Sequence, residues 1–418
     1  MIKERIKGLY KNGFFHIFAG NILNKLLAFI SSIVIVRLVS KAEYANLAYV
    51  DNIYSYVALF AGMGMGSAIL KYCSSDNQRK NLSYLKFALK YGILFQIGVV
   101  AFLIIVALLF QFPFSGIKNL VLFYCFYPVL DYCFLVILNM IRALLQSKLY
   151  VNISVIQMGS VMAAGIVLAL FAGVKGVLAA RYIAVLIAGS MGAAFIIKRF
   201  KGIQEERLSR SEIKAFLSMA VSLLIANLFS LVMPLNETFL INNLIRDEVV
   251  TANYKVATMF PVQITFISSS LMVYYFPIIA RMDNKKEVWK LSKKIEIFTG
   301  VVILFIVLCG IVLSKYIILG IYGKRYYDSV EISRIFWIVY SLNAGFRMIP
   351  MNILPAIGKA GFNAIAAGAT SIIHLGIDYF MISNYGIAGV AVATGLMYFL
   401  SGISYWSYLY ICCREREK

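Results

Sequence analysis

The chain has 418 residues, of which 61% are hydrophobic and 14% charged, with a mean hydropathy of +0.82. Soluble domains hold roughly 45–50% apolar and 25% charged residues, so these values exclude a soluble globular protein and indicate an integral membrane protein. The net charge of +21 does not point to nucleic acid, because the basic residues cluster between apolar runs, as in the cytoplasmic loops of membrane proteins.

The first thirteen residues place Ile2, Ile6 and Leu9 on one helical face with lysines opposite. This pattern predicts an amphipathic helix that lies in the plane of the cytoplasmic membrane surface.

Apolar runs of about twenty residues follow and predict about twelve transmembrane helices, an all-α polytopic membrane protein. In the first half the runs cover Phe14 to Val39, Tyr44 to Ala68, Phe87 to Phe110, Asn119 to Leu144, Tyr150 to Ala172 and Lys175 to Ile197. In the second half they cover Phe216 to Ile245, Val250 to Ala280, Glu296 to Leu319, Ile332 to Ile357, Phe362 to Asn384 and Ile387 to Cys412.

The two halves come into register when the sequence is shifted by 210 to 213 residues. The matched pairs are Lys148 with Lys359, Gly173 with Gly386, Gly176 with Gly389 and Tyr44 with Tyr254. Many secondary transporters are built from such repeats and bind their substrate near the bilayer midplane, so the repeat indicates a transporter.

Lysine and arginine counts set the predicted orientation, because short loops rich in these residues stay in the cytoplasm. The two tails and the even-numbered loops hold 27 of the 40 basic residues, so both termini are expected in the cytoplasm and the two six-helix repeats are expected to be parallel. The predicted regions are an amphipathic segment 1–13, a repeat 14–200, a linker 201–213, a repeat 214–412 and a tail 413–418.

No enzyme, metal or cofactor signature is visible in the sequence. The six cysteines have neither metal-ligand nor disulfide spacing, and no GxxxxGK[ST] nucleotide-binding loop occurs. We therefore expect no metal, no cofactor and no catalytic site.

Three segments resemble the bacterial polysaccharide-unit (O-antigen) flippases. They are Arg37 to Tyr44 (RLVSKAEY), the glycine-rich Gly62 to Gly66 (GMGMG), and Ile321 to Tyr327 (IYGKRYY) with Ser329 and Val330 after it. The resemblance places the chain in the multidrug/oligosaccharidyl-lipid/polysaccharide exporter superfamily. It implies two six-helix bundles that form a V around a central cavity.

The function implied by this resemblance is a flippase of the bacterial inner membrane. It would move a polyprenyl-diphosphate-linked oligosaccharide from the cytoplasmic to the outer leaflet by alternating access, driven by a proton or sodium gradient. The resemblance also implies a working monomer in contact with membrane lipid, with polysaccharide polymerase machinery as a partner.

Charged residues inside the spans are the candidate site residues, since a charge in the bilayer costs a few kcal/mol unless it faces a cavity or a partner. Lys25 lies in the first half and Arg347 in the second, so the two cations could clamp a diphosphate. Pairing with an acid such as Asp131, or snorkelling of the lysine, is the alternative. Arg181 and Lys255 lie nearer the outer ends of their spans, where substrate binding competes with snorkelling.

Acidic residues and one histidine are the candidates for ion coupling. Glu237 follows Pro234 in an otherwise apolar span, where a freed carbonyl and neighbouring polar groups could form an ion site in an unwound stretch; a kink with mutually satisfied groups is the alternative. His374 and Asp378 share a helix face and could exchange protons or form a static pair. Asp51 and Asp131 complete the acidic set.

Two other function classes stay open. A drug or organic-cation antiporter would use Glu237, Asp51 and Asp378 to bind a cationic substrate. A polytopic enzyme or assembly scaffold would be expected to carry a large extramembrane loop or a carboxylate cluster at one face, and neither is visible.

Overall fold

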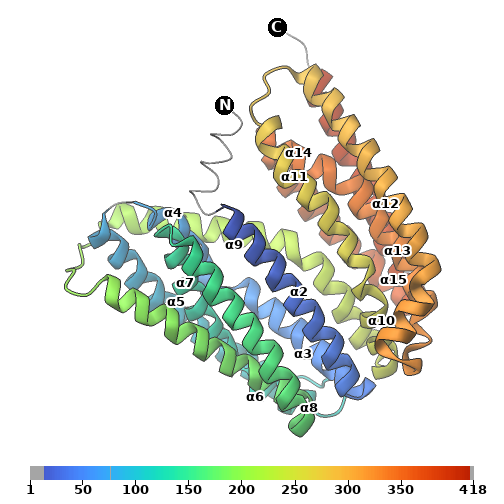
Figure 1. The fold of residues 1–418 in the computed structure, drawn as a ribbon, viewed down its shortest axis with the longest axis horizontal. Coiled ribbons are helices and arrows are strands. Elements are labelled where there is room, and N and C mark those ends of the chain that lie inside the picture. Colours follow the sequence, from blue (N-terminus) through green and yellow to red (C-terminus); the bar gives the residue numbers. More distant parts are fainter. Residues whose placement is uncertain (1–13, 76, 415–418) are drawn as a thin grey trace. The chain divides into compact units, whose positions relative to one another are not determined.

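The computed structural model describes residues 14–75 and 77–414, and nearly all of this part of the chain is helical (Figure 1). The predicted amphipathic segment 1–13 and all but the first two residues of the predicted tail 413–418 lie outside the described residues. Within these described residues, eight helices are long and apolar enough to cross a membrane. Large apolar side chains such as Leu94, Phe171 and Phe305 are exposed on these helices, as expected for surfaces that face lipid. The prediction of an all-α membrane protein is confirmed.

The chain forms two compact units, Met1–Leu228 and Phe229–Lys418, and the division falls within α9 (Arg210–Leu240). The first turns of α9 belong to unit 1 because Phe216 is buried there against Tyr72, Tyr84 and Phe87. The repeat boundary expected at residues 201–213 stays a prediction.

Unit 1 consists of helices whose positions follow the predicted spans of the first half. They are α2 (Phe14–Leu38), α3 (Lys41–Leu59), the 3-10 turn η1 (Ala61–Gly64), α4 (Met65–Tyr72), α5 (Gln78–Leu109), α6 (Ile117–Tyr124), α7 (Tyr127–Ala143) and α8 (Ser147–Arg199). Helix α8 packs against α2 and α7, and α5 packs against α7. Tyr132 of α7 stabilises the contact between α5 and α7. Its hydroxyl donates to the carbonyl of Ala88 (2.7 Å), and its ring fills the space that Gly62 and Gly92 leave open.

Unit 2 repeats this order of helices. After α9 come the π-helical η2 (Ile241–Ile245), α10 (Glu248–Met259), the 3-10 turn η3 (Pro261–Ile264), α11 (Thr265–Ile279), α12 (Lys285–Tyr322), the 3-10 turn η4 (Lys324–Tyr326), α13 (Ser329–Leu342), the π-helical η5 (Asn343–Arg347), α14 (Met348–Ala356) and α15 (Ala360–Arg414). The broken span α3–η1–α4 of unit 1 corresponds to α10–η3–α11, and α8 corresponds to α15. The repeat predicted from sequence is thus visible in the helix order.

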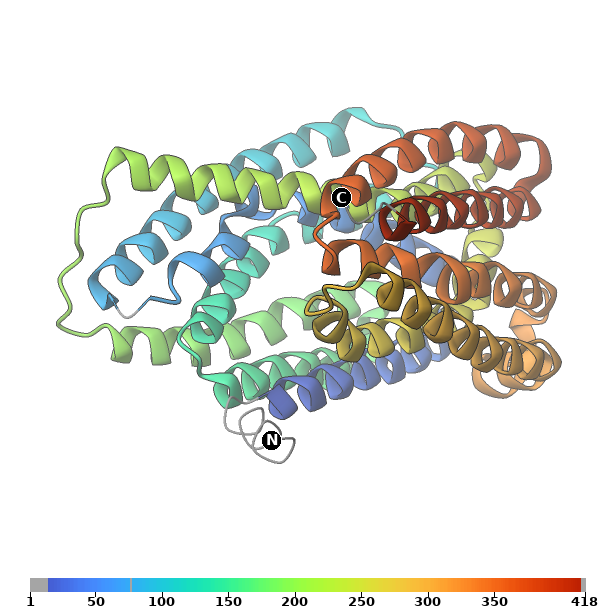
Figure 2. The same cartoon turned by 90° about the horizontal axis from the view of Figure 1, so that it is seen from above.

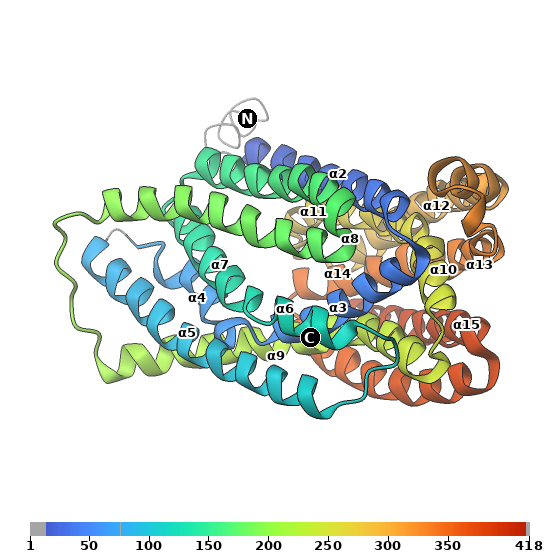
Figure 3. The same cartoon turned by 90° about the horizontal axis from the view of Figure 1, so that it is seen from below.

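Helices α8 and α15 are each two spans joined by one glycine. They contain 53 and 55 residues, which at 1.5 Å per residue would reach about 80 Å, far beyond the roughly 30 Å of the bilayer core. Gly173 and Gly386 leave helical geometry, and the chain reverses there: a Cβ added to Gly176 would lie 2.0 Å from the carbonyl oxygen of Leu168. Figure 2 shows the two arms of α15 side by side, and Figure 3 shows those of α8. Counting both arms of α8 and α15 turns the eight helices of the described residues into ten spans, and α9 and the α13–α14 segment cover the two remaining predicted runs.

The span that contains Pro234 differs from expectation. The sequence predicted unwinding at the proline, but α9 stays helical through it to Leu240, and the wider π-helical turn η2 comes afterwards. A proline removes only one backbone donor, and the next polar residues make side-chain contacts instead of replacing helical hydrogen bonds. The stretch around Pro234 is therefore helical rather than unwound.

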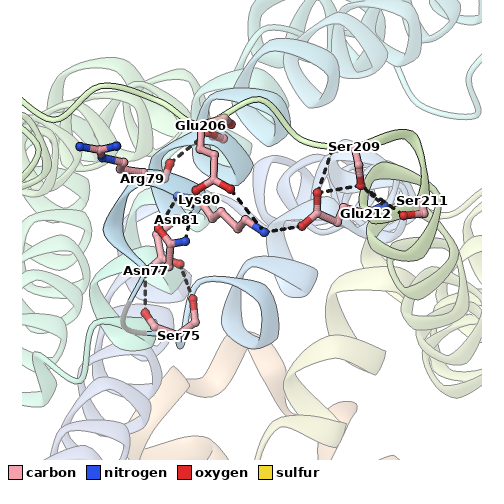
Figure 4. A network of polar contacts seen from close by, with 10 residues as sticks. Ser75, Asn77, Arg79, Lys80, Asn81, Glu206, Ser209, Ser211 and Glu212 are labelled. Carbon is pink, nitrogen blue, oxygen red and sulfur yellow. Dashed lines mark hydrogen bonds and ion pairs between the residues drawn. The ribbon is translucent and has the colours of Figure 1, made fainter.

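Ion pairs and hydrogen bonds connect the segment before α9 to the start of α5 (Figure 4). Lys80 Nζ lies 2.8 Å from a carboxylate oxygen of Glu212 and 3.5 Å from one of Glu206, and the side chain of Asn77 donates to Glu206 (3.2 Å). Glu212 also accepts from the backbone N–H of Ser209 (2.8 Å), while the Ser209 hydroxyl accepts from the Glu212 N–H (3.3 Å). This Ser-x-x-Glu capping box begins α9 and is readable in the sequence.

Candidate functional site

Glu237 is the centre of a buried polar cluster in unit 2. Its side chain lies near the end of α9 and the residue is 3% exposed. One carboxylate oxygen accepts a hydrogen bond from the Tyr254 hydroxyl of α10 (2.9 Å), and the other accepts one from the Thr394 hydroxyl of α15 (3.1 Å). Three membrane helices therefore converge on one carboxylate.

His374 and Asp378 face the same carboxylate from the first arm of α15. Nδ1 of His374 lies 3.2 Å from a carboxylate oxygen of Asp378, and its Nε2 lies 4.0 Å from one of Glu237. Both residues are fully buried, and these close contacts do not have hydrogen-bond geometry. A buried carboxylate is costly unless a donor or a cation neutralises it. Two carboxylates, an imidazole and two hydroxyls thus lie close together, an arrangement suited to holding or exchanging a proton.

Arg347 lies at the end of η5 between aromatic rings. Its guanidinium carbon is 5.6 Å from the ring centroid of Tyr398 and 5.8 Å from that of Tyr405, and Nη1 donates to the side chain of Asn343 (3.1 Å). No carboxylate of residues 14–75 and 77–414 lies within ion-pair distance of it. Its positive charge is therefore held by ring faces and an amide, and remains available to an anion.

Lys255 and Lys25 are the other predicted substrate cations. Lys255 donates from α10 to the hydroxyl of Thr238 (2.8 Å), the residue after Glu237. Lys25 is exposed on α2 of unit 1. Since Lys25 and Arg347 belong to different units, the clamp between them stays a prediction.

Asp51 and Arg181 form an ion pair inside unit 1. Nη1 of Arg181 contacts one carboxylate oxygen of Asp51, and Nη2 donates to the other (3.0 Å). The guanidinium also lies over the ring of Tyr124, 5.7 Å from its centroid. Asp51 comes from α3 and Arg181 from the second arm of α8, so this pair joins two spans and balances the charge of each partner.

Asp131 of α7 lies beside this pair and is held by tyrosines. It accepts from the hydroxyl of Tyr54 (2.5 Å) and from that of Tyr127 (3.4 Å). The described residues around them line a partly open cavity of about 330 Å³, with Asp51, Arg181 and Gln157 among its lining residues.

The structure thus sorts the predicted charges into two groups. Glu237, His374 and Asp378 come together, as their shared candidate role requires, whereas Asp51 and Asp131 lie in a different unit. Sequence reasoning did not single out Tyr254 and Thr394 as partners of Glu237. A buried hydroxyl in an apolar span was the available signal for Thr394, but its partner Glu237 is 157 residues away.

Residues 10–283 match a protein family described as polysaccharide biosynthesis protein, and this region is well over half of the chain. The chain belongs to the polysaccharide biosynthesis protein family. The matched region contains Glu237 and its partner Tyr254, as well as the whole of the Asp51–Arg181 group. The resemblance to polysaccharide-unit exporters is confirmed.

A curated relative of this family member is named "Putative O-antigen transporter" and comes from Shigella flexneri. The two are 23% identical over 245 residues, which make up 58% of this chain. The match spans 57% of the relative's length.

Solved structures share the fold of this family member. A structure of the lipid II flippase MurJ in an inward closed conformation superposes with a TM-score of 0.78 at 15% identity, over 95% of this chain and 87% of that one. An inward-facing multidrug resistance MATE transporter of the MOP superfamily superposes with a TM-score of 0.69 at 12% identity, over 93% and 94% of the two chains.

Proposed function

We propose that this protein is a flippase that moves polyprenyl-diphosphate-linked oligosaccharide units across the cell membrane for surface polysaccharide biosynthesis. The observation that carries the proposal is the match of most of the chain to the polysaccharide biosynthesis protein family. The fold shared with a protein named lipid II flippase supports it, since that name describes a flippase that acts on a lipid. The protein would work in the bacterial inner membrane with both termini cytoplasmic, as its loop charges favour.

The anionic head of the substrate needs a cation that the protein has not already neutralised. Arg347 supports this role because its described neighbours are rings and an amide rather than a carboxylate. We assign the diphosphate contact to Arg347, with Lys25 as the second half of the clamp. Arg181 fits this role poorly, because Asp51 already balances its charge.

Movement against a gradient needs an energy source, and the cluster around Glu237 is the proposed coupling site. Its carboxylates, imidazole and hydroxyl are buried in unit 2 and can exchange a proton or hold a sodium ion. Binding of the ion would favour one state of an alternating-access cycle, because a buried unneutralised carboxylate is costly.

The test is the sidedness of the lipid-linked oligosaccharide pool in cells that lack the gene. A flippase deletion should accumulate the completed unit on the cytoplasmic side, and mass spectrometry of the polyprenyl-diphosphate lipids would identify its sugars. In the deletion strain complemented with Arg347→Ala, the export rate should be no more than about a tenth of the wild-type rate, because a charge-assisted contact to phosphate is lost.

The matched control is Arg334→Ala, on the same broken span. Arg334 is paired with Glu331 at the surface (2.6 Å), so its replacement should leave export unchanged. An unaltered lipid pool in the deletion strain would overturn the proposal.

A drug or organic-cation antiporter is the second candidate, and the specific observation that favours it is the pair of buried carboxylates Glu237 and Asp378. Resistance to cationic drugs on overexpression, abolished by Glu237→Gln, would support this candidate over the flippase.

A further inference from the structure

The cavity of unit 1 has no assigned role in the proposed transport cycle. It has a volume of about 330 Å³, and its lining comes from α2, α3, α6 and the two arms of α8, with Tyr127 of α7. Pockets for small ligands range from roughly 300 to 1,000 Å³, so this cavity can hold about one sugar ring, and the rest of an oligosaccharide head would extend outside it.

The charges of the cavity exclude a diphosphate or an organic cation as its natural ligand. Either would need an opposite charge that is not yet balanced, but Asp51 and Arg181 neutralise each other through two contacts. Asp131 is not one of the residues that line the cavity, and its two oxygens accept from tyrosine hydroxyls. A neutral ligand that offers both donors and acceptors matches such a wall better.

Both hydrogen-bond donors and hydrogen-bond acceptors still face the cavity. Arg181 uses three hydrogen bonds on Asp51 and Tyr124, which leaves further N–H groups for a ligand. The Asp51 side chain is 40% exposed, so its carboxylate can accept more hydrogen bonds. Gln157 of the first arm of α8 adds an amide that both donates and accepts.

An aromatic wall completes the cavity and is held rigidly. The rings of Tyr124 and Tyr127 stack with centroids 4.6 Å apart and planes 14° apart, and Tyr54 leans on both at 5.4 and 5.2 Å. The hydroxyls are anchored as well: Tyr54 and Tyr127 donate to Asp131, and Tyr124 accepts from Arg181. Tyr54 is only half-buried, so its ring can contact an apolar ligand face at little cost in side-chain entropy.

We propose that this cavity is a carbohydrate subsite that binds one uncharged sugar residue of the transported lipid-linked oligosaccharide. Asp51, Arg181 and Gln157 hydrogen-bond the ring hydroxyls, and Tyr54 packs against the C–H face of the sugar. The inference rests on the proposed function. It assigns Asp51 and Arg181 to sugar recognition, in place of ion coupling and phosphate binding.

The test compares two probes on the full-length protein in lipid nanodiscs. One is the lipid-linked oligosaccharide extracted from the deletion strain, and the other is polyprenyl diphosphate without sugar. The dissociation constant of the sugar-free probe divided by that of the sugar-bearing probe isolates the contribution of the sugar. Gln157→Ala and Tyr54→Ala should each reduce this ratio about three- to tenfold while binding of the sugar-free probe stays at the wild-type level, which also shows that the variants fold.

Two control variants sharpen the result. Tyr54→Phe keeps the ring and loses the bond to Asp131, so it should retain more of the ratio than Tyr54→Ala. Phe102→Ala removes an exposed side chain of α5 outside the cavity and should change nothing. A wild-type preference for the sugar-bearing probe that both Gln157→Ala and Tyr54→Ala retain would overturn the subsite alone. If the wild-type protein binds neither probe, the proposed function and the subsite are both overturned.

Discussion

Gly173 and Gly386, 213 residues apart, adopt the same unusual backbone conformation, with φ and ψ of 54° and −134° in the first and 58° and −136° in the second. Each reverses the chain between the last two spans of its half. Residues with a Cβ are strained in this region of φ and ψ, which explains why both positions are glycine.

Replacing either glycine by alanine should destabilise the protein, and Gly173 should be the more sensitive position. Backbone strain alone costs about 1–3 kcal/mol. At Gly386 a new Cβ meets nothing within 4 Å, whereas at Gly173 it would lie 2.3 Å from a carboxylate oxygen of Glu43. Melting temperatures of the purified variants in detergent measure the difference. In a Glu43→Ala background the Gly173→Ala change should cost no more than Gly386→Ala; an undiminished gap would contradict the steric cause.

The Asp51–Arg181 pair predicts a non-additive response to charge removal. Asp51→Asn or Arg181→Gln alone leaves one charge without its partner and should cost about 1–3 kcal/mol, less than for a fully buried pair because the side chains are 40% and 21% exposed. The double variant Asp51→Asn/Arg181→Gln should be destabilised by less than the sum of the two. Thermal unfolding of the four proteins gives the coupling, and strict additivity would show that the two charges act independently.

Local features of this chain were predictable from sequence, but contacts between distant spans were not. The glycine pairs that aligned the two halves also mark where α8 and α15 reverse, because glycine reports a backbone requirement at its own position. Helical spacing likewise placed His374 and Asp378 on one face. Nothing in a span, however, identifies the partner of its polar residue, so the pairing of Asp51 with Arg181, 130 residues away, needed the structure.

Glu212 predicts a pH dependence of stability at the linker before α9. Bonds from Lys80 and from Ser209 lower the pKa of Glu212 from its usual 4.5 to about 2. Because the folded pKa lies below the unfolded one, this contribution is complete above about pH 4.5 and is lost as the pH falls toward 2. The melting temperature of Glu212→Gln should therefore lie below that of the wild type at neutral pH, and the two should converge between pH 4.5 and 2.

A nearby ion pair serves as the control for this experiment. Glu205 lies 3.1 Å from Lys86, but both side chains are more than half exposed, so Glu205→Gln should change the melting temperature little at any pH. An equal effect of Glu205→Gln and Glu212→Gln would indicate a general surface-charge effect instead of the bonds to Lys80 and Ser209.

The hydrogen bonds to Glu237 predict that the coupling ion and the substrate can be separated by mutation. Thr394→Val keeps the shape of the side chain but removes the hydroxyl that donates to the carboxylate, and Glu237→Gln removes the charge itself. In proteoliposomes Glu237→Gln should abolish the stimulation of flipping by an imposed proton or sodium gradient, while binding of the lipid-linked oligosaccharide persists. Thr394→Val should raise the ion concentration needed for half-maximal flipping, because one ligand of the proposed site is lost.

Thr370→Val is the matched control for Thr394→Val. The Thr370 hydroxyl bonds only to carbonyls of its own helix, so this variant should behave as the wild type. Gradient-stimulated flipping by Glu237→Gln at the wild-type rate would exclude Glu237 as the coupling residue.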